Sequence, residues 1–194
     1  MLNNLDLTKI LFLDIETVPQ VSSYDSLDEE TAKLWDDKAN KLSRSEMTGE
    51  EMFERAGIYA EFGKIICISV GYFVLREGGK REFRMRSFYG DEEKLLLREF
   101  ADLLNNHFSS PTQLLCAHNG KEFDFPYIAR RLVVNRIQIP AILNSVGKKP
   151  WEVQHLDTME MWKFGDWKSF TSLKLLAHIL DIPTPKTDIE GKDV

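Results

Sequence analysis

The stretch that decides the fold is K-I-L-F-L-D-I-E-T-V-P, from Lys9 to Pro19. Its apolar run from Ile10 to Leu13 is short and is soon followed by a proline, which is typical of a buried strand. Side chains two residues apart on a strand point to the same face, so we expect Asp14 and Glu16 to project side by side. Two carboxylates held that close raise each other's pKa, and a cation between them removes the repulsion. Hard oxygen ligands at a strand end suit Mg²⁺ or Mn²⁺.

The same two carboxylates also have a simpler interpretation. Charged side chains are mostly exposed, so an isolated D-x-E pair is typical of a strand end that turns toward solvent. The choice between a solvated strand end and a site therefore depends on what the rest of the chain brings to Asp14 and Glu16.

The bulk composition narrows the class of protein. A chain of 194 residues with 43% hydrophobic content can form one domain with a full core. No apolar run approaches the roughly 20 residues that span a bilayer, and the N-terminus lacks the features of a signal peptide. Cys67 and Cys116 both lie in apolar runs, so we expect free buried thiols in a reducing compartment, the cytoplasm. The net charge of −6 argues against a protein that merely coats nucleic acid, but not against a metal-assisted enzyme that grips a few nucleotides.

Five stretches have the hydrophobic pattern of strands and three have that of helices. The predicted strands cover residues 9–17, 64–75, 81–88, 113–117 and 153–158. The predicted helices are one capped by Asp91 that runs to about Phe108, one that begins at Asp124 and Pro126, and one capped by Ser169 or Thr171 that ends before Pro183.

Two connections have their own signals. Gly78 and Gly79 predict a hairpin between the second and third strands, because glycine adopts positive φ. We interpret the arginines of the third strand (Arg81, Arg84 and Arg86), which do not all share one face, as protection of a sheet edge rather than a nucleic-acid contact. Residues 20–61 contain two capping-box patterns, starting at Ser26 and at Thr48, and predict a helical insertion without chemistry of its own.

The order of these elements predicts an α/β layer with a mixed sheet. Three antiparallel strands come first, and two right-handed crossovers then bring 113–117 and 153–158 beside the first strand. Ligands in such sheets bind outside the carboxyl ends of the strands. The polar residues at or just beyond those ends are Asp14, Glu16, Asn119, Asp124 and Asp157. This convergence favours a site over a solvated strand end.

Two of these segments resemble the first two motifs of the DEDD 3′–5′ exonucleases: D-I-E-T at 14–17, and N-G-K-E-F-D-F-P-Y at 119–127. The likeness is to the proofreading exonuclease domain of family-B DNA polymerases and its stand-alone bacterial relatives. The segment from His155 to Pro183 also looks like the last strand and following helix of that family. The resemblance implies a ribonuclease H-like α/β fold, a mixed five-stranded sheet flanked by helices, in one domain over 1–194 with an insertion at 20–61.

The resemblance also implies roles for individual residues. Asp14, Glu16 and Asp124 would be the catalytic carboxylates and would bind two divalent ions, Mg²⁺ or Mn²⁺. Two ions about 4 Å apart both activate water and stabilise the leaving alkoxide. The implied substrate is the 3′ end of single-stranded nucleic acid, with DNA the favoured polymer. Its contacts would be Thr17 at the 3′ end, Asn119 as an orienting group, and Phe123 beside the terminal base or sugar.

One part of the family pattern is absent from the sequence. The family carries a third motif, Tyr-x3-Asp or His-x4-Asp, on a C-terminal helix, and neither pattern occurs here. We therefore expect a truncated chain that holds metal poorly and cuts weakly. The alternative is a catalytically incomplete nucleic-acid-binding module of the same fold.

The remaining candidates favour structural roles. We expect Asp157 to be a supporting or helix-capping carboxylate rather than a ligand, and His118 and His155 to be packed side chains. Trp151, Trp162 and Trp167 have the right chemistry to stack on bases, but packing in the core or loops is the favoured interpretation.

Overall fold

The computed structural model describes residues 5–43 and 47–183, so the tail at 184–194 and part of the N-terminal segment 1–8 lie outside the described residues. Five strands form one sheet: β1 (Ile10–Pro19), β2 (Gly63–Leu75), β3 (Arg81–Tyr89), β4 (Leu114–Ala117) and β5 (Leu156–Asp157). Their order is β3-β2-β1-β4-β5. The β1–β2 and β2–β3 pairs are antiparallel, and β1–β4 and β4–β5 are parallel. The predicted mixed sheet is confirmed, and β4 lies beside β1 as expected, whereas β5 pairs with β4 and not with β1.

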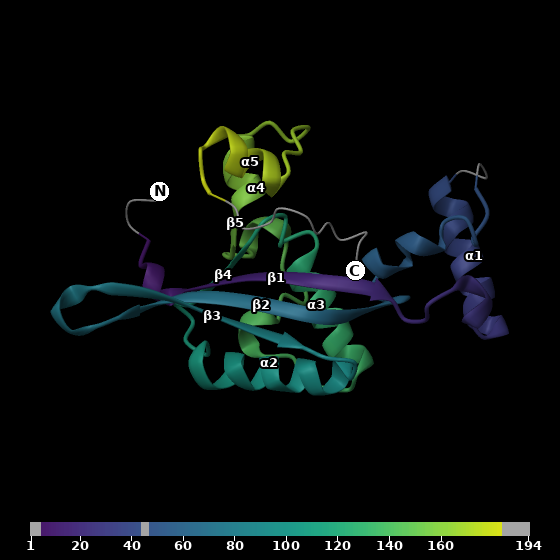
Figure 1. Ribbon diagram of the computed structural model, residues 1–194, viewed down its shortest axis with the longest axis horizontal. Helices are drawn as coiled ribbons and strands as arrows, with labels where there is room; N and C mark the ends of the chain where they lie inside the picture. The colour runs from purple at the N-terminus through teal and green to yellow at the C-terminus, as the bar shows by residue number, and fades with distance from the viewer. Residues whose placement is uncertain (1–4, 44–46, 184–194) are drawn as a thin grey trace.

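The main core lies between the sheet and two helices, α2 (Glu93–His107) and α3 (Asp124–Val134), which cover the lower face of the sheet in Figure 1. From β1, the side chains of Leu11, Leu13 and Ile15 enter this core. Because strand side chains alternate, Asp14 and Glu16 point to the opposite face. The position of the two carboxylates is thus a consequence of burying the three apolar residues that alternate with the outward-facing positions of β1.

Two short helices, α4 (Thr158–Lys163) and α5 (Leu173–Ile179), lie on the other side of the sheet, above β4 and β5 in Figure 1. His118, directly after β4, holds them in place. Its Nε2 lies 2.8 Å from the carbonyl oxygen of Thr171, and its Nδ1 lies 2.9 Å from the hydroxyl of Thr158. A carbonyl only accepts, so Nε2 carries the proton, and the structural interpretation of His118 is confirmed.

The described residues between 20 and 61, namely 20–43 and 47–61, form a group of helical turns at one end of the sheet (Figure 1), with α1 (Glu29–Ser43) and a 3₁₀ turn at Phe53–Ile58. They have a small core of their own around Trp35, which packs with Ala39, Met52, Phe53 and Ala56. The indole N–H of Trp35 donates to the carbonyl of Gly49 at 2.7 Å.

Three predicted helix caps are wrong. Asp28, not Ser26, caps α1, and its carboxylate accepts from the Thr31 amide at 2.9 Å. The reason is local: the charged acceptor stands directly before the helix, whereas the Ser26 hydroxyl contacts that of Ser23. Helix α2 begins at Glu93, after Glu92 and without a side-chain cap, rather than at Asp91. Helix α5 is capped by Ser172, whose hydroxyl accepts from the amide of Leu175, instead of by Ser169 or Thr171.

Two other turn predictions are confirmed. Thr48 and Glu51 form a reciprocal capping box, although the chain continues as a 3₁₀ turn rather than an α-helix. Gly78 and Gly79 both have positive φ in the hairpin between β2 and β3. Within the described residues, no helix has the length and apolar character needed to cross a membrane.

Candidate active site

The two carboxylates of β1 lie on the sheet face away from α2 and α3. Asp14 is exposed and Glu16 is half-buried. Across the antiparallel β1–β2 pair they stand opposite Ser69 and Cys67, respectively. The strand thus presents two acidic side chains about 7 Å apart along one face, near the end where parallel strands of such a sheet bind ligands.

Asp124, the first residue of α3, is only 4% exposed and lies against β1. Burial and the negative charges of Asp14 and Asp157 raise the pKa of its carboxyl to about 7, against the lowering effect of hydrogen bonds from its own amide and that of Ile15. The pairing of β1 with β4 ends at Phe12, so the Ile15 amide has Asp124 as an acceptor where β4 no longer supplies one. The structure therefore brings the second motif into electrostatic contact with the first.

The three predicted ligands do not form a closed cage. Among residues 5–43 and 47–183, no group of three or more His, Cys, Asp or Glu side chains is arranged to hold a metal ion. Asp14 and Asp124 interact, while Glu16 follows two residues later on the same face of β1. This geometry is compatible with Mg²⁺, which usually keeps several waters and binds through one or two carboxylates together with substrate phosphates.

The turn that delivers Asp124 suits its Asn-Gly sequence. Asn119 has φ +63°, a left-handed conformation that Asn tolerates better than most residues, and its carbonyl accepts from the amides of Glu122 and Phe123. At Gly120, an added Cβ would approach the Cβ of Ala117 to 2.4 Å. The turn is compact, and Asn119 is already committed to a backbone role.

Asp157 is fully engaged by the backbone, as its predicted capping role requires. Its carboxylate accepts from the amides of Asn119 at 2.9 Å and Lys121 at 3.1 Å, and also from Met159 and Glu160 at the start of α4. It therefore holds the second-motif turn and α4 together at the ends of β4 and β5. His155 is also structural: Nε2 donates to the Ile142 carbonyl, Nδ1 accepts from the Leu115 amide, and burial lowers its pKa.

The predicted substrate contacts lie beside a residue that sequence reasoning missed, Tyr127. The ring of Phe123 is half-buried and packs against Tyr127 with centroids 5.3 Å apart. The Tyr127 hydroxyl donates to the Gly57 carbonyl at 2.7 Å and also bonds with the Thr17 side chain. Burial raises the pKa of Tyr127. Thr17 and Phe123 thus share one support on α3, close to Asp124.

A second missed feature, an ion pair between Glu93 and Arg131, fixes the position of α3. Arg131 donates to both oxygens of Glu93, at 2.8 and 2.6 Å, and to the Ala60 carbonyl at 2.8 Å. Glu93 also accepts from the Ile65 amide of β2. Burial raises the pKa of Glu93, but hydrogen bonds from Arg131, Ile65 and Asn135 outweigh that effect and lower it overall. A signal existed: both charged residues lie on helix faces that are otherwise apolar.

The expectations for cysteine and tryptophan have mixed outcomes. Cys67 and Cys116 are free thiols, with Cys116 buried and Cys67 half-buried, so the free-thiol prediction is confirmed. Burial, and the charge of Asp157, raise the pKa of Cys116 to about 11. Packing in the core or loops is wrong for Trp151 and Trp167, which are 77% and 76% exposed. Other large apolar residues close to them in sequence, such as Val146, Phe164 and Phe170, are exposed as well. An average tendency of tryptophan to be buried therefore did not predict the exposure of Trp151 and Trp167.

Solved structures with a similar fold are DNA-processing enzymes. A family B DNA polymerase from the hyperthermophilic archaeon Pyrobaculum calidifontis aligns with 95% of this chain and 20% of its own, at 15% identity and a TM-score of 0.52. E. coli exonuclease I in complex with a dT13 oligonucleotide aligns over 79% of this chain and 28% of its own, at 11% identity and a TM-score of 0.40. This chain thus spans less than a third of either protein, and the polymerase, at 15% identity, shows the fold alone.

The family itself is shown by sequence. A comparison with curated proteins finds no match. A family model of the RNase H superfamily matches residues 53–194, which include the second motif and all strands after β1. Together with the sheet order, this match establishes that the chain belongs to the RNase H superfamily and has the fold of the DEDD-type exonucleases.

Proposed function

We propose that this chain is a metal-dependent 3′–5′ exonuclease that hydrolyses phosphodiester bonds at the 3′ end of single-stranded nucleic acid, with DNA the favoured polymer. The observation that carries the proposal is the contact between the two motifs. Asp124, brought from over a hundred residues away, is buried against β1 and interacts with the charge of Asp14. Structural neighbours that process DNA, one of them complexed with single-stranded DNA, support this choice of chemistry within the superfamily.

Asp14, Glu16 and Asp124 would hold two divalent ions, either Mg²⁺ or Mn²⁺. Bound there, such ions supply a water of lowered pKa and neutralise charge on the leaving oxygen. The donor set fits them, because carboxylates are hard oxygen ligands and because the Asp14–Asp124 repulsion is relieved by positive charge. Ligands beyond these carboxylates would come from water and from the phosphate of the substrate.

The other residues of the site bind and orient the substrate. The Phe123 ring, half-buried on the support of Tyr127, offers an apolar face to the terminal base or sugar. The Thr17 hydroxyl exchanges its bond with Tyr127 for one with the 3′ end. Asn119 keeps its carbonyl in the turn and offers its side-chain amide to a phosphate or sugar oxygen. We also place the protein in the cytoplasm, in keeping with its two free thiols.

A nuclease assay on end-labelled oligonucleotides tests the proposal. With Mn²⁺ or Mg²⁺, a single strand labelled at the 5′ end should give a ladder that shortens from the 3′ end, and EDTA should stop the reaction. Asp14→Asn and Asp124→Asn should each lower the rate by at least about a hundredfold, because each removes a ligand charge. The matched control is Asp102→Asn, an exposed carboxylate on α2 that should retain full activity. Undiminished cleavage in EDTA or in Asp14→Asn would refute the assignment.

The second candidate function is a catalytically incomplete nucleic-acid-binding module. The observation that favours it is the lack, within the described residues, of three carboxylates grouped to hold a metal. Binding of a single-stranded oligonucleotide without cleavage, at any concentration of Mn²⁺ or Mg²⁺, would support this alternative over the enzyme.

A further inference from the structure

The sheet face that carries Asp14 and Glu16 continues across β2 to the edge strand β3. The register of the two antiparallel pairs defines rows of side chains: Glu16 is opposite Cys67, which is opposite Tyr89, and Asp14 is opposite Ser69, which is opposite Ser87. Adjacent strands are about 4.8 Å apart, so Tyr89 lies about 10 Å from Glu16 in the same row. The sheet face that carries Asp14 and Glu16 thus continues onto β3. We call this side of β3, which carries Ser87 and Tyr89, its outer face.

That outer face exposes large apolar side chains. Tyr89 is 78% exposed, Met85 is 74% exposed and Phe83 is 47% exposed, and their even spacing along the strand puts them on one side of β3. The tip of the Phe83 ring lies over Gly71 of β2, where an added Cβ would come within 2.3 Å of its Cζ. A row of exposed aromatic and thioether groups does not protect a sheet edge from association, so the edge-protection interpretation does not account for it.

The charge of this hairpin is opposite to that of the molecule. Between Leu75 and Tyr89 there are five basic residues and two acidic ones, in a chain of net charge −6. Arg81 has the same alternation as Phe83 and Met85 and so shares their face, next to Lys80 in the turn. The hairpin is therefore a local basic, aromatic element, which is the composition that single-stranded nucleic acids select.

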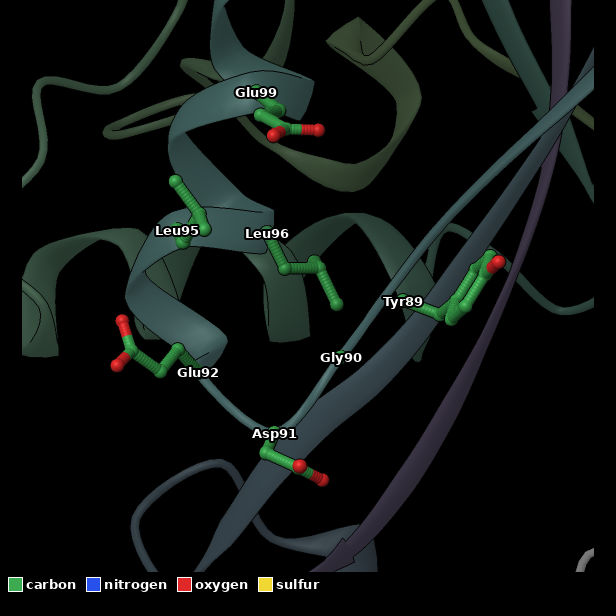
Figure 2. Close-up of a pocket in the computed structure, with 7 residues that line it drawn as sticks. All are labelled: Tyr89, Gly90, Asp91, Glu92, Leu95, Leu96 and Glu99. Atoms are coloured by element: carbon green, nitrogen blue, oxygen red, sulfur yellow. The ribbon is translucent and has the colours of Figure 1, made fainter.

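The carboxyl end of β3, which is the end away from the hairpin, is unsuited to bind a phosphate backbone. A pocket of about 270 Å³ between β3 and α2 is lined by Tyr89 and Gly90 at the end of β3, by the acidic residues Asp91, Glu92 and Glu99, and by Leu95 and Leu96 (Figure 2). Tyr89 and Leu96 lie on opposite sides of the β3 ribbon in this view, so the tyrosine ring faces away from the helix. The acidic lining repels phosphates, so a strand that passes Tyr89 is directed along β3 toward the hairpin instead.

We propose that the single strand upstream of the scissile phosphate lies along the outer face of β3. Its bases stack on Tyr89 and Met85, and its backbone runs toward Arg81 and Lys80 of the hairpin. This inference rests on the proposed function, since it takes the 3′ end to lie at Asp14 and Glu16. It adds a binding surface formed by β3 that is separate from the proposed catalytic residues.

The test is how the affinity depends on oligonucleotide length. Fluorescence anisotropy with labelled oligo-dT, in EDTA to prevent cleavage, compares a dinucleotide with a strand of about eight nucleotides. The double variant Tyr89→Ala/Met85→Ala should bind the longer strand at least about tenfold more weakly, because stacking is lost, and should bind the dinucleotide as the wild type does. The control, Trp151→Ala, removes an equally exposed aromatic residue, at the opposite edge of the sheet, and should change neither affinity.

The outcomes separate this inference from the proposed function. If the double variant, folded as judged by its melting temperature, binds the longer strand like the wild type, the β3 surface is refuted and the exonuclease proposal stands. If the wild type neither binds nor cuts any oligonucleotide, the proposed function fails. If the wild type is a dimer by light scattering and the double variant is a monomer, the apolar face is a protein interface and the β3 path is overturned.

Discussion

Asp124 and Asp157 are both buried carboxylates at the end of the sheet, and they differ in what surrounds them. Asp157 is 3% exposed and accepts four backbone hydrogen bonds, from Asn119, Lys121, Met159 and Glu160. Asp124 is 4% exposed, but its two backbone donors do not offset burial and the neighbouring negative charges, which raise its pKa to about 7. Burial alone therefore does not mark a functional carboxylate, whereas incomplete compensation does. Asp157 holds the fold together, and Asp124 is the one suited to take a cation.

The largest expected effect on the free energy of unfolding follows from removal of the Asp157 carboxylate, whose burial is compensated by backbone hydrogen bonds. Asp157→Ala leaves four backbone amides, one buried and three part-buried, without their acceptor, so we expect a loss of about 3–5 kcal/mol in the free energy of unfolding. Urea denaturation measures it, with Asp102→Ala as the exposed control. A loss below about 1 kcal/mol would show that water satisfies these amides in the variant. It would then be wrong that Asp157, unlike Asp124, stabilises the fold.

The second effect should have the opposite sign. Because the folded pKa of Asp124 is raised from 3.8 to about 7, the native state binds more protons, and stability is lost as the pH rises through that interval. Asp124→Asn removes this cost and should stabilise the metal-free protein by about 2–4 kcal/mol at pH 8, and by less than half of that at pH 5. Denaturation in EDTA at both pH values checks it. Destabilisation at pH 8 would mean that Asp124 is compensated after all.

A metal ion should reverse that second effect. Mn²⁺ added in excess should raise the unfolding free energy of the wild type by about 1–3 kcal/mol at pH 8, because it binds only the folded site. Asp124→Asn should gain little, whereas Asp102→Asn should gain as much as the wild type. Calorimetric melting with and without Mn²⁺ measures this directly. An equal shift in all three proteins would place the ion elsewhere on the molecule.

The sequence predicts what local pattern controls and misses what distant contacts control. The strands, their crossovers and the facing of Asp14 and Glu16 follow from runs and alternation of apolar residues, because the core must be buried. Two of the four donors to Asp157, the amides of Asn119 and Lys121, stand almost forty positions earlier in the chain, and Glu93 and Arg131 are as far apart. No local signal joins such partners. A charged residue within an apolar helix face, as at Glu93, is the one available hint.

The helix caps show a smaller failure of the same kind. Ser26 and Asp28 both suit an N-cap, and the choice depends on where the backbone turns into the helix, within two residues. For Thr17 the sequence placed a hydroxyl at the strand end, but not the tyrosine from α3 that bonds with it. In the candidate site, therefore, the placement of the acidic residues and the capping role of Asp157 were predictable, whereas the support from Tyr127 and from the Glu93–Arg131 pair was not.

The smallest stability effect concerns the turn at Asn119, which leads to Asp124 and whose amide donates to Asp157. Asn119 has φ +63°, so Asn119→Gly should change the unfolding free energy by less than about 1 kcal/mol, whereas Asn119→Ala should cost about 1 kcal/mol more because alanine resists the left-handed conformation. If Asn119 also orients the substrate, both variants should lose nuclease activity to a similar extent despite their different stabilities. If activity instead follows stability, remaining intact in Asn119→Gly, the side chain serves only the turn. In that case Asp124 reaches Asp14 through a backbone conformation that glycine supplies equally well.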